Sequence, residues 1–500
     1  MRRTITLSLA AGLLLSLSTA AFAELTPLER LGKSLFFDPI ASPDRQACAD
    51  CHGPAVGFTG PISNVNKHGA VMAGAITTRF GNRKPPSAAY ATQSPILHWD
   101  TSDELFLGGN FWDGRATGAK LGNPAADQAL GPFLNPVEMN NPDKKSVLEQ
   151  IAGAPYAGLW AQTFGGPIKL NNANTIDREY DRIGLAIAAF EASSEVNPFS
   201  SKFDYVEKGQ AKFTAAEAWG KELFEGKANC AACHMAPLFT DFSYDNIGTP
   251  KNTENPFYSM DQVLLDNGQP INPLGRNWVD PGLGGFLATL PDAFFTALGL
   301  DKATQMAENL GKMKVPTLRN IDKRPNAGFG KAYMHNGAFK SLKEVVHFYN
   351  TRDVEPWPAP EQLQNVNHDE LGNLGMTSAE EDAVVAFLKT LSDGFDPRGA
   401  ALPAALATTG DDATDAPVGL HVRYLAPGRY QFAYALPAAG SVNVSLFDVA
   451  GREVGTLVDG PQAAGSHVVD WSSRSLPQGI YLVNLRAGAT QMTQKVLVSR

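Results

Sequence analysis

The sequence predicts a mainly α protein with two related helical halves in tandem, followed by a small all-β sandwich domain. Two observations predict the halves. The pattern T-x-x-E-x-x-G-K-x-L-F occurs at 26–36 and again at 214–224, and an apolar helix closes each half. A third observation predicts the β domain, because short alternating runs replace helical periodicity after residue 396. We expect the halves at 24–196 and 197–396, a linker at 397–418 and the sandwich at 419–500.

Each half is expected to begin and end with a helix whose limits are encoded locally. In both copies of the repeat, the threonine hydroxyl and the glutamate carboxylate form a capping box that binds free amides of the first turn. The closing helices are expected at 183–192 and 380–391, and Thr377 with Glu380 caps the second of them.

Composition limits the classes of function. A hydrophobic content of 43% and a charged content of 19% are typical of a globular protein. The formal net charge of −9 argues against a nucleic-acid partner.

Residues 1–23 have the pattern of a secretory signal. Arg2 and Arg3 precede an apolar run from Ile5 to Leu17, and a small-residue site ends at Ala23. The alternative is an N-terminal membrane anchor, but the apolar run is shorter than the ~20 residues that a span requires. We expect export, a mature chain that begins near Glu24, and no transmembrane segment in it.

All four cysteines lie in two copies of C-x-x-C-H, at 48–52 and 230–234. Two thiols at this spacing can each form a thioether with one haem vinyl group, and the adjacent histidine then binds the iron. The alternatives are a redox dithiol, which does not need the histidine, and a zinc site, which would need both pairs in one tetrahedron. The spacing predicts two covalently bound haem c groups, attached through Cys48, Cys51, Cys230 and Cys233, with His52 and His234 as proximal ligands.

With these motifs in place, residues 24–396 resemble the bacterial di-haem cytochrome c peroxidase/MauG superfamily. The resemblance implies two cytochrome c-like domains, the first with a peroxidatic haem and the second with an electron-transfer haem. It is carried by LGKSLFFDP (31–39), CADCHGPAVGFTG (48–60), FWDGRA (111–116), NPVEM (135–139), IAAFEAS (187–193), VPTLRNI (315–321), YMHNG (333–337) and SLKEVVHFYN (341–350).

The resemblance also implies catalytic roles. Glu138 in NPVEM matches the distal acid–base residue, and Gln128 matches the distal glutamine. Trp112 in FWDGR matches the tryptophan that lies between the haems and relays electrons. The alternatives are a solvated loop acid for Glu138 and ordinary core packing for Trp112.

Two further residues match iron ligands of the family. His68, sixteen positions after His52, matches a removable sixth ligand of the peroxidatic haem, and the alternative is a loop histidine. Tyr349, in HFYN, matches the tyrosine ligand of the MauG type on the second haem. The alternative is a packing tyrosine, with sulfur supplied by Met334, Met313 or Met306.

Two departures from the family pattern concern the junction of the halves. The segment 322–331 is an insertion, and Lys84 stands where the family has an asparagine that helps to bind an inter-domain calcium ion. Because the remaining calcium ligands would be backbone carbonyls, one calcium ion is left open as a third cofactor.

The C-terminal segment resembles the Ig-like module of flagellar hook-capping proteins and the sorting domains that direct proteins to the cell surface. Ser441–Gly451, Ser475–Tyr481 and the closing strand Lys495–Val498 carry this resemblance. The alternative is an accessory structural domain, in which His421 and His467 are surface or packing residues. We therefore expect a periplasmic protein or one exported to the cell surface.

Three functions follow. The first is a peroxidase that reduces hydrogen peroxide to water with electrons from a small exported cytochrome c or copper protein; family peroxidases are often homodimers. The second is a MauG-like oxidase acting on a protein or organic substrate, and the third is a non-catalytic electron-transfer cytochrome. His68 favours the first and Tyr349 the second, whereas Glu138, Gln128 and Trp112 count against the third.

Overall fold

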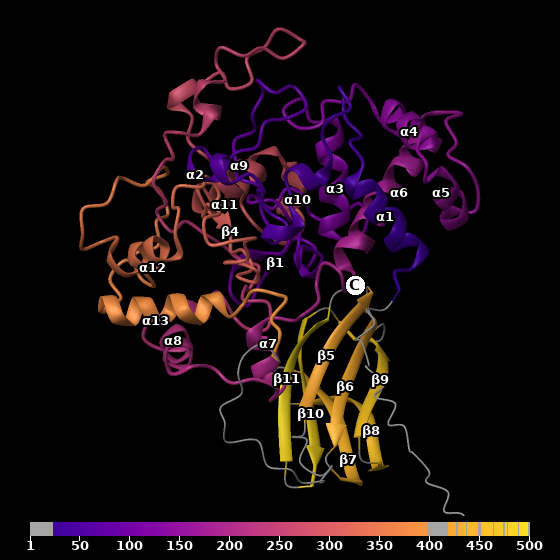
Figure 1. Cartoon of the computed structure of the whole chain (residues 1–500), viewed down its shortest axis with the longest axis vertical. Helices are drawn as coiled ribbons and strands as arrows, with labels where there is room; N and C mark the ends of the chain where they lie inside the picture. The colour runs from indigo at the N-terminus through magenta and orange to yellow at the C-terminus, as the bar shows by residue number, and fades with distance from the viewer. Residues whose placement is uncertain are drawn as a thin grey trace, which may run out of the picture.

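The computed structural model is a mixture of helices and strands (Figure 1). It describes residues 24–397, and residues 419–498 except 427–428, 437, 449–451, 464, 474–475, 478 and 489. The predicted signal segment at 1–23 and the predicted linker, apart from Pro397, lie outside the described residues. Among the described residues, no helix combines the length and the apolar composition that a membrane crossing requires.

Helices joined by long loops form residues 24–397, with two short antiparallel strand pairs among them. In one hairpin β1 (His98–Asp100) pairs with β2 (Leu105–Leu107), and β3 (Tyr244–Asp245) pairs with β4 (Met313–Lys314), which is distant in sequence. The helices are α1 (Pro27–Phe37), α2 (Ser63–Lys67), α3 (Pro124–Leu134), α4 (Lys144–Gly153), α5 (Ala157–Phe164), α6 (Ala173–Ala192), α7 (Lys202–Glu207), α8 (Ala215–Glu225), α9 (Gly282–Thr289), α10 (Asp292–Leu298), α11 (Lys302–Glu308), α12 (Leu342–Thr351) and α13 (Ser378–Lys389).

The repeated sequence pattern produces the same helix start twice. Thr26 caps α1 and Thr214 caps α8, and in both cases the capping box is complete. The predicted closing helix at 380–391 is α13, which begins two residues earlier and has its own capping box. The predicted helix at 183–192 is only the second half of α6, which begins at Ala173 after the cap Asn172.

The opening helix of each half crosses the closing helix at a glycine. A Cβ atom on Gly32 of α1 would lie 1.8 Å from the carbonyl oxygen of Ala186 in α6. A Cβ atom on Gly220 of α8 would lie 1.9 Å from the carbonyl oxygen of Ala383 in α13. Only glycine permits this close approach, so the internal repeat is a repeat of helix packing as well as of sequence.

Each helix pair has its own hydrophobic core. The first core contains Leu35, Phe36 and Phe190, and the second contains Phe224, Phe348 and Phe387. Arg319 lies where the two halves meet and contacts residues that are distant from it in sequence. Its guanidinium forms two hydrogen bonds of 2.9 Å with Asp204 and lies over the ring of Tyr90, whose hydroxyl donates to Asp393.

The strands from residue 419 form two antiparallel sheets, which appear as a separate block in Figure 1. One has the order β5–β6–β9 and the other β11–β10–β7–β8. Alternate residues such as Val444 and Leu446 of β7 are buried in a common core with Phe432 of β6. The strands are β5 (Gly419–Ala426), β6 (Arg429–Leu436), β7 (Gly440–Asp448), β8 (Glu453–Gln462), β9 (Gly465–Ser472), β10 (Gly479–Ala487) and β11 (Thr490–Val498).

Candidate functional site

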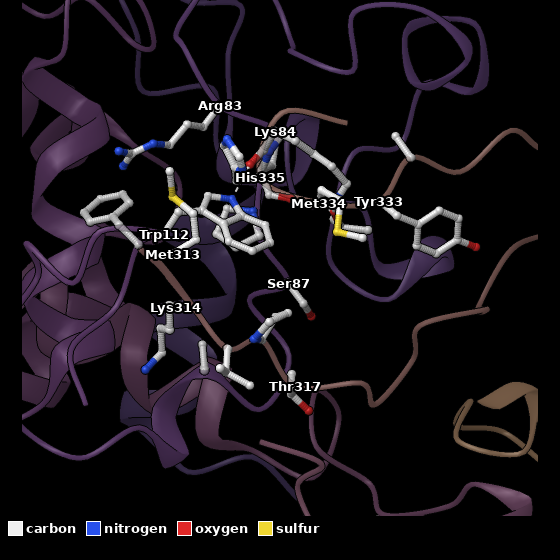
Figure 2. Close-up of a pocket in the computed structure, with 18 of the residues that line it drawn as sticks. Arg83, Lys84, Ser87, Trp112, Met313, Lys314, Thr317, Tyr333, Met334 and His335 are labelled. Atoms are coloured by element: carbon white, nitrogen blue, oxygen red, sulfur yellow. Dashed lines mark hydrogen bonds between the residues drawn. The ribbon is translucent and has the colours of Figure 1, made fainter. Parts of the chain in front are cut away.

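The two C-x-x-C-H motifs open onto one continuous cavity of ≈390 Å³, within the ~300–1,000 Å³ usual for ligand and cofactor pockets. Figure 2 shows a close-up of the pocket, including Trp112 and His335. Side chains from both halves line it, including Cys48, Cys51, His52, Cys230, His234, Trp112, Gln128, Glu138 and Tyr349. The structure therefore brings together nearly all the predicted site residues.

The histidines of the two motifs are held in the same way. Each motif starts with one turn of 3-10 helix, η1 (Cys48–Asp50) and η4 (Cys230–Ala232). His52 Nδ1 donates to the carbonyl oxygen of Phe58 at 3.2 Å, and His234 Nδ1 donates to that of Phe239 at 2.8 Å. A proton on Nδ1 leaves Nε2 as the nitrogen that can bind a metal. Burial lowers the pKa of both histidines, which keeps them neutral, the form that binds iron.

The cysteines fit haem attachment. All four are free thiols. Burial raises the pKa of Cys51, Cys230 and Cys233 to about 12, so these thiols are uncharged, whereas zinc is bound by thiolates. In the part of the chain that the structure describes, no group of three or more His, Cys, Asp and Glu side chains could hold a metal ion. Neutral thiols and a neutral histidine beside a large cavity suit two haem c groups.

Glu138 and Gln128 belong to the first half. Gln128 projects from α3, and Glu138 lies in the turn after it, where its amide donates to the carbonyl oxygen of Asn135 at 3.0 Å. Burial raises the pKa of the Glu138 carboxyl, and Arg115 and Asn135 oppose this only in part. A raised pKa makes the carboxyl more basic than a free glutamate, which favours proton uptake by a general acid–base.

Trp112 is buried and held by residues of both halves (Figure 2). Its Nε1 donates to the carbonyl oxygen of Lys84 at 2.8 Å, and its own carbonyl oxygen accepts from the amide of Lys314 at 2.8 Å. The edge of its ring lies against His335, with 6.3 Å between the ring centroids. This position agrees with a tryptophan between two haems, and the relay role stays a prediction.

Tyr349 lies in α12 beside the second motif and packs on the same core as Cys230. Burial and the nearby carboxylate of Asp245 raise its pKa, so an iron ligand would have to displace the hydroxyl proton. Among the alternatives, Met313 and Met334 line the cavity, whereas Met306 packs in a separate cluster with Leu283. The sulfur candidates are therefore Met313 and Met334, and tyrosine ligation stays a prediction.

His68 is one of two predicted site residues that do not line the cavity; the other is Cys233, which precedes the cavity residue His234. The side chain of His68 is 61% exposed and pairs with Glu254 at 3.4 Å, just after α2. It is absent from the described residues that line the cavity. Its loop would have to move for it to reach the first iron, so the gating role stays a prediction.

The structure adds cavity residues that the sequence reasoning missed as functional. Lys84 and Lys314 both line the cavity, and each begins a short motif, K-x-P-S at 84–87 and K-x-P-T at 314–317. An extension of the internal repeat would have found this pair. His335 is also buried there, and its Nε2 has no hydrogen-bond partner among the described residues.

Comparisons with known proteins agree with this geometry. Residues 26–212 match the family model of the di-haem cytochrome c peroxidases, and residues 427–499 match that of the secretion system C-terminal sorting domain. The methylamine utilization protein MauG of Paracoccus denitrificans is 34% identical over 389 residues, which is 73% of this chain and 88% of MauG. The cytochrome-c peroxidase IdrP2 of Denitromonas iodatirespirans is 28% identical over 365 residues, 72% of this chain and 80% of IdrP2.

Among solved structures, the diheme peroxidase BthA from Burkholderia thailandensis is similar, with a TM-score of 0.58 and 28% identity. The match covers 76% of this chain and 89% of BthA, which supports the di-haem peroxidase fold. The chain therefore belongs to the di-haem cytochrome c peroxidase and MauG family of oxidoreductases, which carry two covalently bound haem c groups.

Proposed function

We propose that this protein is an exported peroxidase that reduces one hydrogen peroxide to two waters, consuming two electrons and two protons. The observation that carries the proposal is that Glu138 and Gln128 line the cavity onto which both C-x-x-C-H motifs open, with Glu138 near enough to Cys51 to raise the pKa of that thiol. A cytochrome that only transfers electrons has no use for an acid at that place.

Glu138 is the proposed acid–base. Its carboxylate would take the proton from one peroxide oxygen and return it to the other, which would leave as water when the O–O bond breaks. Gln128 orients the peroxide through its side-chain amide. When bound, the two haems supply the iron and one redox centre each for this two-electron reaction.

Trp112 is the proposed relay between the two redox centres. Its hydrogen bonds to Lys84 and Lys314 fix the indole between residues of both halves. Electrons would enter at the second haem, proposed to be bound by His234 and Tyr349, and pass to the first through this ring. Because the ring is held at both its nitrogen and its backbone, it needs little reorganisation on electron transfer.

The proposed architecture is two mainly α cytochrome c-like domains at 24–196 and 197–396, a linker at 397–418 and a β-sandwich at 419–500. The family match at 427–499 supports export and favours delivery to the cell surface, with retention in the periplasm as the alternative. The proposed donor is a small exported cytochrome c or copper protein. A homodimer stays a prediction.

A second function is favoured by a specific observation. Tyr349 lies at the second motif, and MauG is 34% identical over most of its length. These features support an oxidase that acts on a protein or organic substrate with the same two haems.

Steady-state turnover tests the choice. The purified holoprotein is mixed with hydrogen peroxide and a reduced small cytochrome c, with and without pre-reduction of the enzyme. We expect donor oxidation that depends on peroxide. Greater turnover after pre-reduction would support a removable ligand such as His68. No donor oxidation under either condition would remove the peroxidase function.

A further inference from the structure

Lys84 places a cation at the junction of the two halves (Figure 2). Its side chain is buried, and its ammonium group donates to Thr59 Oγ1 at 2.9 Å and to the carbonyl oxygen of Pro85 at 3.2 Å. Its amide donates to the carbonyl oxygen of His335 in the other half at 2.7 Å. Burial lowers its pKa to about 8, which still leaves it mainly protonated at neutral pH.

Two more lysines, of which one is partly buried and the other buried, repeat this arrangement. Lys314, the counterpart of Lys84 in the second half, donates to Ser94 Oγ at 3.1 Å and to the carbonyl oxygen of Gly108 at 3.2 Å. Lys331 donates to three carbonyl oxygens at 2.9 to 3.2 Å, which belong to Val56, Asn320 and Lys323. All of these acceptors are uncharged oxygens, the kind of group that also surrounds a bound metal cation.

A calcium ion does not fit this junction. Calcium takes six to eight oxygen ligands, and the lysine at position 84 offers a positive charge in place of a side-chain oxygen. An ammonium group has three donors and no acceptor. The ammonium group of Lys84 already donates hydrogen bonds to the Thr59 hydroxyl and the Pro85 carbonyl oxygen. Its positive charge would also repel a calcium ion placed beside it in the protein interior, where charges are weakly screened.

We propose that the ammonium group of Lys84 takes the place of a bound calcium ion at the junction, so that the holoprotein assembles and functions without calcium. The proposal rests on membership of the family and not on peroxide as the substrate. The metal content is measured without turnover, so a failure of the peroxidase proposal would leave this test unaffected.

The test measures calcium and iron in the holoprotein after purification in calcium-containing buffer, before and after dialysis against EGTA. We expect iron for two haems, no stoichiometric calcium, and the same melting temperature in excess calcium and in EGTA. The variants Lys84→Asn and the milder Lys84→Gln restore a neutral side-chain oxygen. Each should gain one calcium ion per chain and a melting temperature that rises by several degrees with calcium.

Lys314→Asn is the matched control, because it removes from the same cavity a lysine that binds Ser94 and Gly108, and it leaves the contacts of Lys84 with Thr59 and Pro85 in place. It should gain no calcium. Stoichiometric calcium in the wild-type protein would overturn the proposal. So would Lys84 variants that bind no more calcium than Lys314→Asn.

Discussion

The two halves of the cytochrome region share a framework and differ in what they direct into the cavity. Gly32 and Gly220 make equivalent helix crossings, and the histidine of each C-x-x-C-H motif donates to a phenylalanine carbonyl oxygen. The first half adds Glu138, whereas the second adds Tyr349. The comparison indicates that the duplicated helices and motifs form a common framework, while on the proposed function the segments between them determine which half does the acid–base chemistry.

A second difference lies on the closing helices themselves. Superposing the crossings pairs Phe190 with Phe387, so Glu191 of the first half corresponds to Leu388 of the second. Both side chains line the cavity, but Glu191 is a buried acid whose pKa burial raises to about 8. The first half therefore carries a second carboxyl group that the second half lacks at that position.

The largest expected effect comes from Glu138→Gln, which removes the proposed acid–base group of the first half. We expect peroxide turnover to fall by about 10²–10⁴-fold, the usual contribution of a general acid–base, with the redox titration of the second haem unchanged. In the wild type, the raised pKa of Glu138 means that turnover falls as pH drops through that pKa, above the ~4.3 of a free glutamate. A turnover rate within threefold of the wild type, roughly, would contradict the assignment.

Tyr349→Met changes the residue that distinguishes the second half and tests whether it binds the second iron. Thioether ligation raises a haem potential, so we expect the second haem to rise by on the order of 0.1 V while the first is unchanged. Tyr333→Phe is the control, since Tyr333 also lines the cavity but is not expected to bind iron. A thioether-to-iron absorption band in Tyr349→Phe as strong as in the wild type would assign the ligand to Met313 or Met334.

Gly32→Ala and Gly220→Ala test whether the frameworks are equivalent. Each added methyl group would collide with a backbone carbonyl, so we expect each to lower the free energy of unfolding by about 1–3 kcal/mol. Gly158→Ala in α5 is the control, because its methyl group would meet open space. Denaturant unfolding of the holoproteins measures the three effects. If only one crossing is sensitive, the halves are not equivalent.

Glu191→Leu, which gives the first half the leucine that the second half has at position 388, is expected to have the smallest effect, on the pH dependence of stability. The folded pKa of about 8 lies above the ~4.3 of an unfolded glutamate, so the stability contribution is complete below pH ~4 and is lost as pH rises to 8. Between pH 5 and 6 the wild type should lose about 1 kcal/mol more than the variant. Denaturant unfolding at the two pH values measures this difference, and parallel losses would contradict the raised pKa.

The parts of the fold that could be predicted are those whose signal is local. The caps Thr26, Thr214 and Thr377 lie next to the helices that they start, and each was found from three neighbouring residues. The first half of α6 was missed because its polar sequence, ANTIDREYDR, shows no apolar stripe until residue 183. The helices α9 to α11 were missed as well, since Gly- and Pro-rich turns separate them.

The same distinction between local patterns and tertiary contacts applies to the site. Adjacent residues reveal the haem motifs, whereas Lys84, Trp112 and Lys314 come together only through the fold. His68 shows the limit of spacing as evidence, because its distance from His52 in sequence does not place it in the cavity. Loop position depends on tertiary packing that no local pattern records.

On the proposed function, the first half carries out a two-electron reduction of peroxide with the second half as its partner. Titration of the fully reduced holoprotein with hydrogen peroxide, without any donor, tests this division of roles. We predict that one peroxide oxidises both haems, and that Glu138→Gln leaves both reduced on the same timescale. Oxidation of a single haem per peroxide, or equal rates in the variant, would contradict the account.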